Sequence, residues 1–157
     1  MRPQLVNDEI YHVVLRAVGD AIIFSDESDY YRGIFSIYEF NNSKPIEIRI
    51  RRIERKKEKN AGCPTPVDSR DKLVEVLAFC FMSNHIHLLL RQIKDDGIVN
   101  FMKKVGGGYA NYFNKKYQRK GHLFNKFKSI HVVDDDQLKT VFAYIHTNPL
   151  SFLSINR

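Results

Sequence analysis

One apolar run, residues 74 to 91, limits the folds open to this sequence more than any other stretch; it reads VEVLAFCFMSNHIHLLLR. Two segments rich in branched and aromatic side chains flank Ser83-Asn84. Serine and asparagine favour tight turns because their side chains bond to nearby backbone groups. The run therefore predicts a β-hairpin, around which the rest of the chain is organised.

The second strand of this hairpin begins with His85 and His87. Side chains alternate between the two faces of a strand, so both imidazoles share one face with Leu89. Two neutral imidazoles on a rigid strand could chelate a divalent metal ion. A His-x-His pair is a short motif, however, and histidines on strands are often satisfied by hydrogen bonds alone. The pair leaves both interpretations open.

Composition indicates a globular chain. Its 157 residues fit one domain, with 43% hydrophobic and 27% charged residues. No segment reaches the roughly 18 apolar residues of a membrane span, so we expect a cytoplasmic protein. Cys63 and Cys80 are far apart and predict neither a disulfide framework nor a zinc cluster. The net charge of +7 favours an anionic partner such as nucleic acid.

Residues 9 to 18 alternate in the manner of a first strand, with Tyr11, Val13 and Leu15 on its apolar face. His12 and Arg16 fall on the opposite face. A solvated sheet surface explains them slightly better than a ligand-facing one, although Arg16 remains a candidate DNA contact. Ser25-Asp26 then predicts the start of a helix from about 26 to 40.

The segment from about 41 to 70 reads as a basic insertion. Residues 44 to 59 hold eight basic side chains and three glutamates, a net charge of +5. Isoleucines at 46, 48 and 50 alternate with charged residues, which predicts an extended arm or edge ribbon. Its arginines could contact DNA phosphates, or they could serve solubility alone. The candidate contacts are Arg49, Arg51 and Arg52.

Residues 97 to 117 carry apolar side chains at helical spacing, which predicts a long core helix. Three consecutive glycines, 106 to 108, predict a kink or the close approach of another backbone. Residues 115 to 128 then interleave cations with aromatic rings, a pattern typical of single-stranded nucleic-acid binding, although a solvated surface is the alternative. Its candidate DNA contacts are Lys115, Lys116, Arg119, Lys120, Lys126 and Lys128.

Residues 129 to 133 predict a last strand, and the aspartates at 134 to 136 predict the start of a final helix. Tyr144 and Asn148 lie one turn apart on its polar side. The element order therefore predicts an α+β, ferredoxin-like βαββαβ core with an antiparallel sheet and one extra C-terminal helix. We expect residues 1–157 to form a single domain with the insertion at about 41–70.

Four motifs, in this order, resemble a known family. They are YHVVLR at 11–16, FMSNHIHLLL at 81–90, YANYFN at 109–114 with GHLFNKFK at 121–128, and YIHTNP at 144–149. The chain resembles the single-tyrosine HUH transposases, and it is most similar to their REP-associated tyrosine transposase branch. The resemblance covers nearly the whole chain apart from the segment 41–70.

The resemblance implies a metal-dependent single-stranded DNA endonuclease and strand transferase that acts through a 5′-phosphotyrosine intermediate at DNA hairpins. By position, Tyr144 matches the nucleophile, and His85, His87 and Asn148 match the metal ligands. The cofactor implied is Mg²⁺ or Mn²⁺, and a homodimer is among the implied assemblies. The chain departs from the family pattern at Ser83, which is usually proline, and at 123–127, where the family usually has a tryptophan-containing run.

Other functions remain as alternatives. A DNA-hairpin-binding regulator without catalysis would keep the basic surface and leave the site idle. An RNA-binding ferredoxin-like module predicts an aromatic signature on the sheet, which the sequence lacks. A two-histidine phosphodiesterase needs two His-x-Ser/Thr motifs, and neither His87 nor His146 supplies one. Pro149 also disfavours helical geometry at Asn148.

Overall fold

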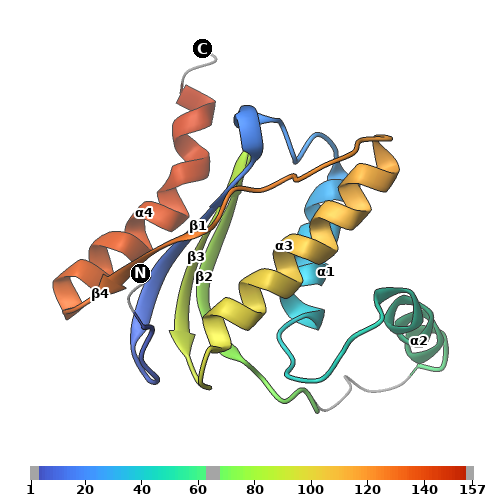
Figure 1. Cartoon of the computed structure of the whole chain (residues 1–157), viewed down its shortest axis with the longest axis horizontal. Coiled ribbons are helices and arrows are strands. Elements are labelled where there is room, and N and C mark those ends of the chain that lie inside the picture. Colours follow the sequence, from blue (N-terminus) through green and yellow to red (C-terminus); the bar gives the residue numbers. More distant parts are fainter. Residues whose placement is uncertain (1–3, 63–67, 155–157) are drawn as a thin grey trace.

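The computed structural model describes residues 4–62 and 68–154 (Figure 1). Its strands and helices alternate in the order expected from the sequence, except for one additional helix in the segment 41–70. In chain order the elements are β1 (Ile10–Arg16), a 3-10 turn (Val18–Asp20), α1 (Glu27–Glu39), α2 (Ile48–Asn60), β2 (Val74–Met82), β3 (His85–Gln92), α3 (Gly97–Lys116), β4 (Lys128–Val132) and α4 (Asp135–Ser154).

The strands form one antiparallel sheet in the order β2-β3-β1-β4. The Ser83-Asn84 turn joins β2 to β3 and pairs Met82 with His85. Each crossover helix, α1 or α3, connects two strands that have a third strand between them, which is the ferredoxin-like arrangement. The predicted hairpin and the predicted α+β fold class are confirmed.

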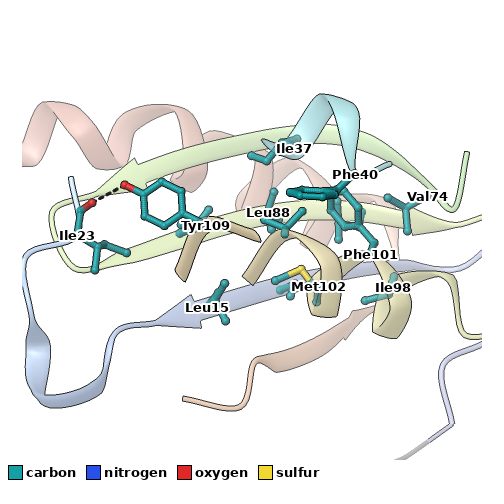
Figure 2. Packing of buried hydrophobic residues seen from close by; sticks show 14 of the residues in the cluster. Leu15, Ile23, Ile37, Phe40, Val74, Leu88, Ile98, Phe101, Met102 and Tyr109 are labelled. Carbon is teal, nitrogen blue, oxygen red and sulfur yellow. Dashed lines mark hydrogen bonds between the residues drawn. The ribbon is translucent and has the colours of Figure 1, made fainter. Parts of the chain in front are cut away.

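Helices α1 and α3 cover one face of the sheet, and the larger core lies between them and the strands (Figure 1). Figure 2 shows Leu88 of β3 among side chains of α3 such as Phe101 and Met102. In the same view the hydroxyl of Tyr109 donates a hydrogen bond to the carbonyl of Ile23. The apolar stripe of the predicted core helix is therefore buried as expected.

Helix α4 covers the other face, across β2 and β3 (Figure 1). A smaller apolar cluster holds it there, including Leu89 of β3, Cys80 of β2 and Ile145 of α4. The side chain of Asp134 accepts a hydrogen bond from the amide of Gln137 at its N-terminus, so the predicted helix start is confirmed. No helix among the described residues has both the length and the apolar character needed to cross a membrane.

The prediction of an extended arm around residues 46–50 is wrong, because Ile48–Asn60 form helix α2. Lysine, arginine and glutamate are strong helix formers, and the alternation of three isoleucines is too short to outweigh them. Helical spacing also places Arg51 and Arg55 one turn apart. Both bind the carboxylate of Glu39 on α1, which is buried. This tertiary contact favours the helix and is not visible in the sequence.

Helix α3 runs without interruption through its three glycines. A Cβ atom at Gly108 would overlap the ring of Phe40, whereas one at Gly107 would meet nothing within 4 Å. The predicted close approach is therefore made by a side chain, and the predicted kink is wrong. Helix α4 also continues through Pro149, so Asn148 is helical despite the proline that follows it.

Candidate active site

Three histidines converge on the sheet face that α4 covers. His12 projects from β1, and His85 and His87 project from the neighbouring strand β3. The Nε2 atom of His12 lies 3.0 Å from Nδ1 of His87, and the Nε2 atoms of His85 and His87 lie 2.9 Å apart. The three imidazoles thus form one continuous chain of close nitrogen contacts.

The side chain of Asn84 determines the proton arrangement in this chain. Its amide nitrogen donates to Asp20, so its oxygen faces Nδ1 of His85 at 2.6 Å and must accept a proton from it. A neutral His85 then has a lone pair at Nε2, which accepts from Nε2 of His87. By the same logic, Nδ1 of His87 accepts from His12. Only one set of neutral tautomers satisfies all these contacts.

Burial keeps the three imidazoles uncharged. Burial, followed by the charges of His85, His12 and Arg16, lowers the pKa of His87 to about 4. Burial also lowers the pKa of His85, with Arg16 acting in the same direction and Asp20 opposing it. Burial likewise lowers the pKa of His12. Near neutral pH all three rings are therefore in the neutral form that can bind a metal ion.

Helix α4 brings Tyr144 to the same place within the same chain. The ring centroid of Tyr144 lies 5.4 Å from that of His87, edge-on at 89°, and 6.2 Å from that of His12. The tyrosine is 48% exposed, so an incoming strand could reach its hydroxyl. Asn148 follows one helical turn later and is half-buried. The structure therefore brings together the predicted nucleophile and the two predicted histidine ligands.

The two Nε2 atoms fit a divalent cation by their spacing. Ligand nitrogens about 2.1 Å from a metal and at right angles to each other are about 3 Å apart, close to the 2.9 Å observed between His85 and His87. Among the described residues no group of three or more His, Cys, Asp or Glu side chains is arranged to hold a metal ion. Asn148, the predicted third ligand, offers an amide oxygen, which hard divalent cations accept.

Two of the predicted DNA contacts share the face of the histidines. Arg16 ends β1 opposite His85 and pairs at 3.1 Å with Asp20 on the surface. Val14 of β1 pairs with His87 on one side and with Lys128 of β4 on the other. Directly paired residues point to the same face of a sheet, so Lys128 lies on the same face as His87, with Val14 between them. Both cations are exposed to an approaching strand.

The other predicted DNA contacts lie elsewhere. Arg49, Arg51 and Arg52 belong to α2, and Lys115 and Lys116 end α3, on the far side of the sheet (Figure 1). Several already have intramolecular partners. Arg51 binds Glu39 and Glu54, Lys116 binds Asp26 and Asp29, and Arg119 donates to Asn114. Lys120 and Lys126 are exposed on the chain between α3 and β4.

The sequence interpretation missed His12 and Asn84 as members of this cluster. The sequence slightly favours a solvated surface for His12, but the structure places its half-buried ring against that of His87, with centroids 5.2 Å apart. His12 and Arg16 are an even number of residues apart on β1, so the sequence does predict that they share one face of the strand. The contact with His87 also requires β1 to lie next to β3 in the sheet. The sequence of a single strand does not reveal that order.

Comparison with known protein families identifies the family of the chain. A family profile described as "Transposase IS200 like" matches residues 67–148, more than half of the chain. The chain belongs to this IS200-like transposase family. No curated protein sequence matches the chain.

Two solved structures are similar to this one. A REP-associated tyrosine transposase bound to a REP hairpin superposes with a TM-score of 0.55 at 11% identity, covering 97% of this chain and 73% of that one. A protein of Deinococcus radiodurans R1, provisionally named a transposase, gives a TM-score of 0.47 at 17% identity over 94% and 95% of the two chains. At this level of identity the first match supports the fold alone.

Proposed function

We propose that this transposase is a metal-dependent single-stranded DNA endonuclease and strand transferase that acts at DNA hairpins through a 5′-phosphotyrosine intermediate. The proposal rests on one observation, the contact of the Tyr144 ring with the rings of His87 and His12 on the sheet. A half-exposed tyrosine beside two uncharged histidines is a poor arrangement for packing alone. It suits a nucleophile adjacent to a cation site.

In this proposal each group has a distinct role. The Tyr144 oxygen attacks the scissile phosphorus, the bond from phosphorus to the 3′ oxygen breaks, and the 5′ phosphate remains on the tyrosine. His85, His87 and Asn148 would hold Mg²⁺ or Mn²⁺, which supplies positive charge against the developing negative charge of the phosphate. The phenolic proton passes to solvent, and solvent protonates the leaving 3′ oxygen. Reversal of the step by a 3′ hydroxyl joins strands without ATP.

DNA in hairpin form is proposed by analogy with the similar structure, which was solved with a REP hairpin. The charge distribution of this chain supports an anionic partner on the same face, since Arg16 and Lys128 flank the histidines. We also propose that residues 1–157 form a single domain and that Lys115, Lys116, Arg119, Lys120 and Lys126 contribute to DNA binding, together with the arginines of α2.

A covalent-adduct assay tests the proposal. Incubation of the protein with a labelled hairpin that carries single-stranded flanks, in the presence of Mn²⁺, should yield a denaturation-resistant adduct on Tyr144. Tyr144→Phe should abolish the adduct, whereas Tyr30→Phe, at another partly exposed tyrosine, should not. Tight hairpin binding without an adduct from the unaltered protein, over a range of divalent ions, would instead support the non-catalytic regulator.

A further inference from the structure

A basic groove lies on the side of the molecule opposite Tyr144, among α1, α2 and α3. It consists of two adjoining hollows of about 830 and 490 Å³. The hollows share Arg32, Arg52, Lys56 and Tyr112. The sheet and two helices separate this groove from the histidines (Figure 1). It is therefore a different surface from the candidate active site.

Most of the positive charge of the groove has no ion-pair partner among the described residues. Among the described residues that line it, none is acidic. Two of its cations have partners, since Arg55 binds Glu39 and Lys116 binds Asp26 and Asp29. Within the described part of the chain, the remaining cations form no ion pair; they are Arg32, Arg49, Arg52, Lys56 and Lys115. Cations gathered in this way repel one another unless an anion lies between them.

Arg32 lines both hollows and has few acceptors within the protein. Its Nε atom is buried and has no hydrogen-bond partner among the described residues, while Nη2 donates only a long bond to the carbonyl of Gly108. Burial, followed by the charge of Arg52, lowers the pKa of Arg32 below its ordinary value. Because Nε is too buried for a ligand to reach, a phosphate in the groove would meet the part of the Arg32 guanidinium that lines it.

Aromatic rings determine which kind of anion fits. Tyr31 and Tyr38 are 63% and 39% exposed along the groove, and Phe35 and Tyr112 also line it. The guanidinium groups of Arg55 and Arg70 lie over the ring of Tyr38, 4.7 and 3.5 Å from its centroid. Because these guanidinium groups lie over Tyr38, the more exposed ring of Tyr31 is the better match for an unpaired base joined to phosphates. Duplex DNA keeps its base faces stacked and offers less to these rings.

We propose that this groove binds a second single-stranded DNA segment, with phosphates at Arg32, Arg49 and Arg52 and a base stacked on Tyr31. The inference rests on the proposed function, because it takes single-stranded DNA as the substrate. It adds a binding site on the opposite face from Tyr144. One DNA strand must then pass around the sheet, or two segments of the substrate bind at once.

Helix α2 offers a matched pair of variants for the test. Arg49 and Arg52 line the groove, whereas Lys57 and Lys59 on the same helix do not. R49Q/R52Q and K57Q/K59Q each remove two positive charges from exposed positions. Binding to a 20-nucleotide oligothymidylate is measured by fluorescence anisotropy at several salt concentrations, in the Tyr144→Phe background and with EDTA present.

R49Q/R52Q should weaken binding about tenfold and lower the salt slope by one to two units, whereas K57Q/K59Q should change affinity less than about twofold. Equal effects of both pairs, or no effect of either, would overturn the proposal. Since the assay uses neither Tyr144 nor a metal, its outcome is independent of the adduct assay. Failure of adduct formation would refute the proposed chemistry alone.

A second arm tests base stacking. Oligothymidylate carrying 5-iododeoxyuridine is irradiated with the protein, and the cross-linked peptides are identified by mass spectrometry. Adducts at Tyr31, lost in Tyr31→Ala, are expected. Cross-links confined to residues 121–128 would overturn the proposal. The proposal would also be overturned if R49Q/R52Q lost binding to anionic lipid vesicles while its oligonucleotide binding stayed unchanged. That result would assign the groove to a membrane surface.

Discussion

Nε2 of His12 lies 3.0 Å from Nδ1 of His87, whereas the other ring nitrogen of His87, Nε2, faces His85. When the Nε2 of His87 presents its lone pair to a cation, the ring proton must move to Nδ1, where His12 becomes its acceptor. His12 is therefore a positioning residue that sets the tautomer and orientation of His87. It would act on the proposed cation site from outside the predicted ligand set.

Loss of His12 should weaken metal binding more than it weakens chemistry. We expect His12→Phe to raise the Mn²⁺ concentration needed for half-maximal adduct formation about 10- to 100-fold, with much of the adduct recovered at saturating Mn²⁺. His12→Gln retains a polar group at the same distance and should restore part of the affinity. An unchanged Mn²⁺ requirement in His12→Phe would exclude this role.

The buried histidines should make the folded state sensitive to acid. In the unfolded chain His87 titrates near its ordinary value of 6.5, but in the folded protein its pKa is about 4. Between these values the unfolded state binds more protons, so stability is complete above about pH 6.5 and declines as the pH falls toward 4. This shift corresponds to about 3 kcal/mol.

Urea denaturation in EDTA, at intervals from pH 4.5 to 7.5, measures this effect. His87→Asn keeps a polar side chain at the position and removes the titration, so its stability should depend less on pH than that of the unaltered protein. Parallel pH profiles for the two proteins would contradict the assignment. His12 and His85 are also shifted downward and leave a smaller residual slope in the variant.

Because Tyr144 and both predicted histidine ligands meet within one chain, catalysis should not require residues of a second subunit. We therefore expect no recovery of adduct formation when Tyr144→Phe protein is mixed with His87→Ala protein. The adduct is quantified after the mixture has been unfolded and refolded together, so that subunits can exchange. Recovery to about a quarter or more of normal activity would show that α4 serves a partner subunit in solution.

Two adjacent glycines of the α3 triplet, Gly107 and Gly108, provide a stability test with its own control. Gly108→Ala places a methyl group against the buried ring of Phe40 and should destabilise the protein by about 1 to 2 kcal/mol, because the core has to shift. Gly107→Ala meets open space and should stabilise it by up to about 1 kcal/mol through helix propensity. Chemical denaturation of both variants measures the difference. Equal effects would show that the ring of Phe40 can move aside.

Local patterns predicted the elements that depend on local interactions. Asp26 caps α1 as expected, with its side chain accepting from the amide of Asp29. Asp96, however, takes the N-cap position of α3 without a side-chain capping bond, and the oxygen of Gln92 accepts from the amide of Ile98 in its place. Gln92 is distant enough in the sequence that no capping pattern includes it.

The errors share a physical origin in contacts between distant segments. Helix α2 depends on the buried carboxylate of Glu39, and the kink expected in α3 is replaced by the fit of Phe40 beside Gly108. His12 joins the candidate site because β1 is placed next to β3. The nucleophile and ligand positions came from the resemblance to a family, since spacing alone left Tyr144 and Asn148 open to ordinary packing roles.

The anchoring of α4 has a consequence for motion. Within the described residues six buried side chains form the cluster beneath α4, compared with twenty in the core under α1 and α3. A helix with so little apolar anchoring can detach at a lower free energy than global unfolding requires. Its amide protons should then exchange with deuterium well before those of α3. Tyr144 would thus be carried on a helix held less firmly than α3, able to withdraw from the sheet and return while the strands stay intact.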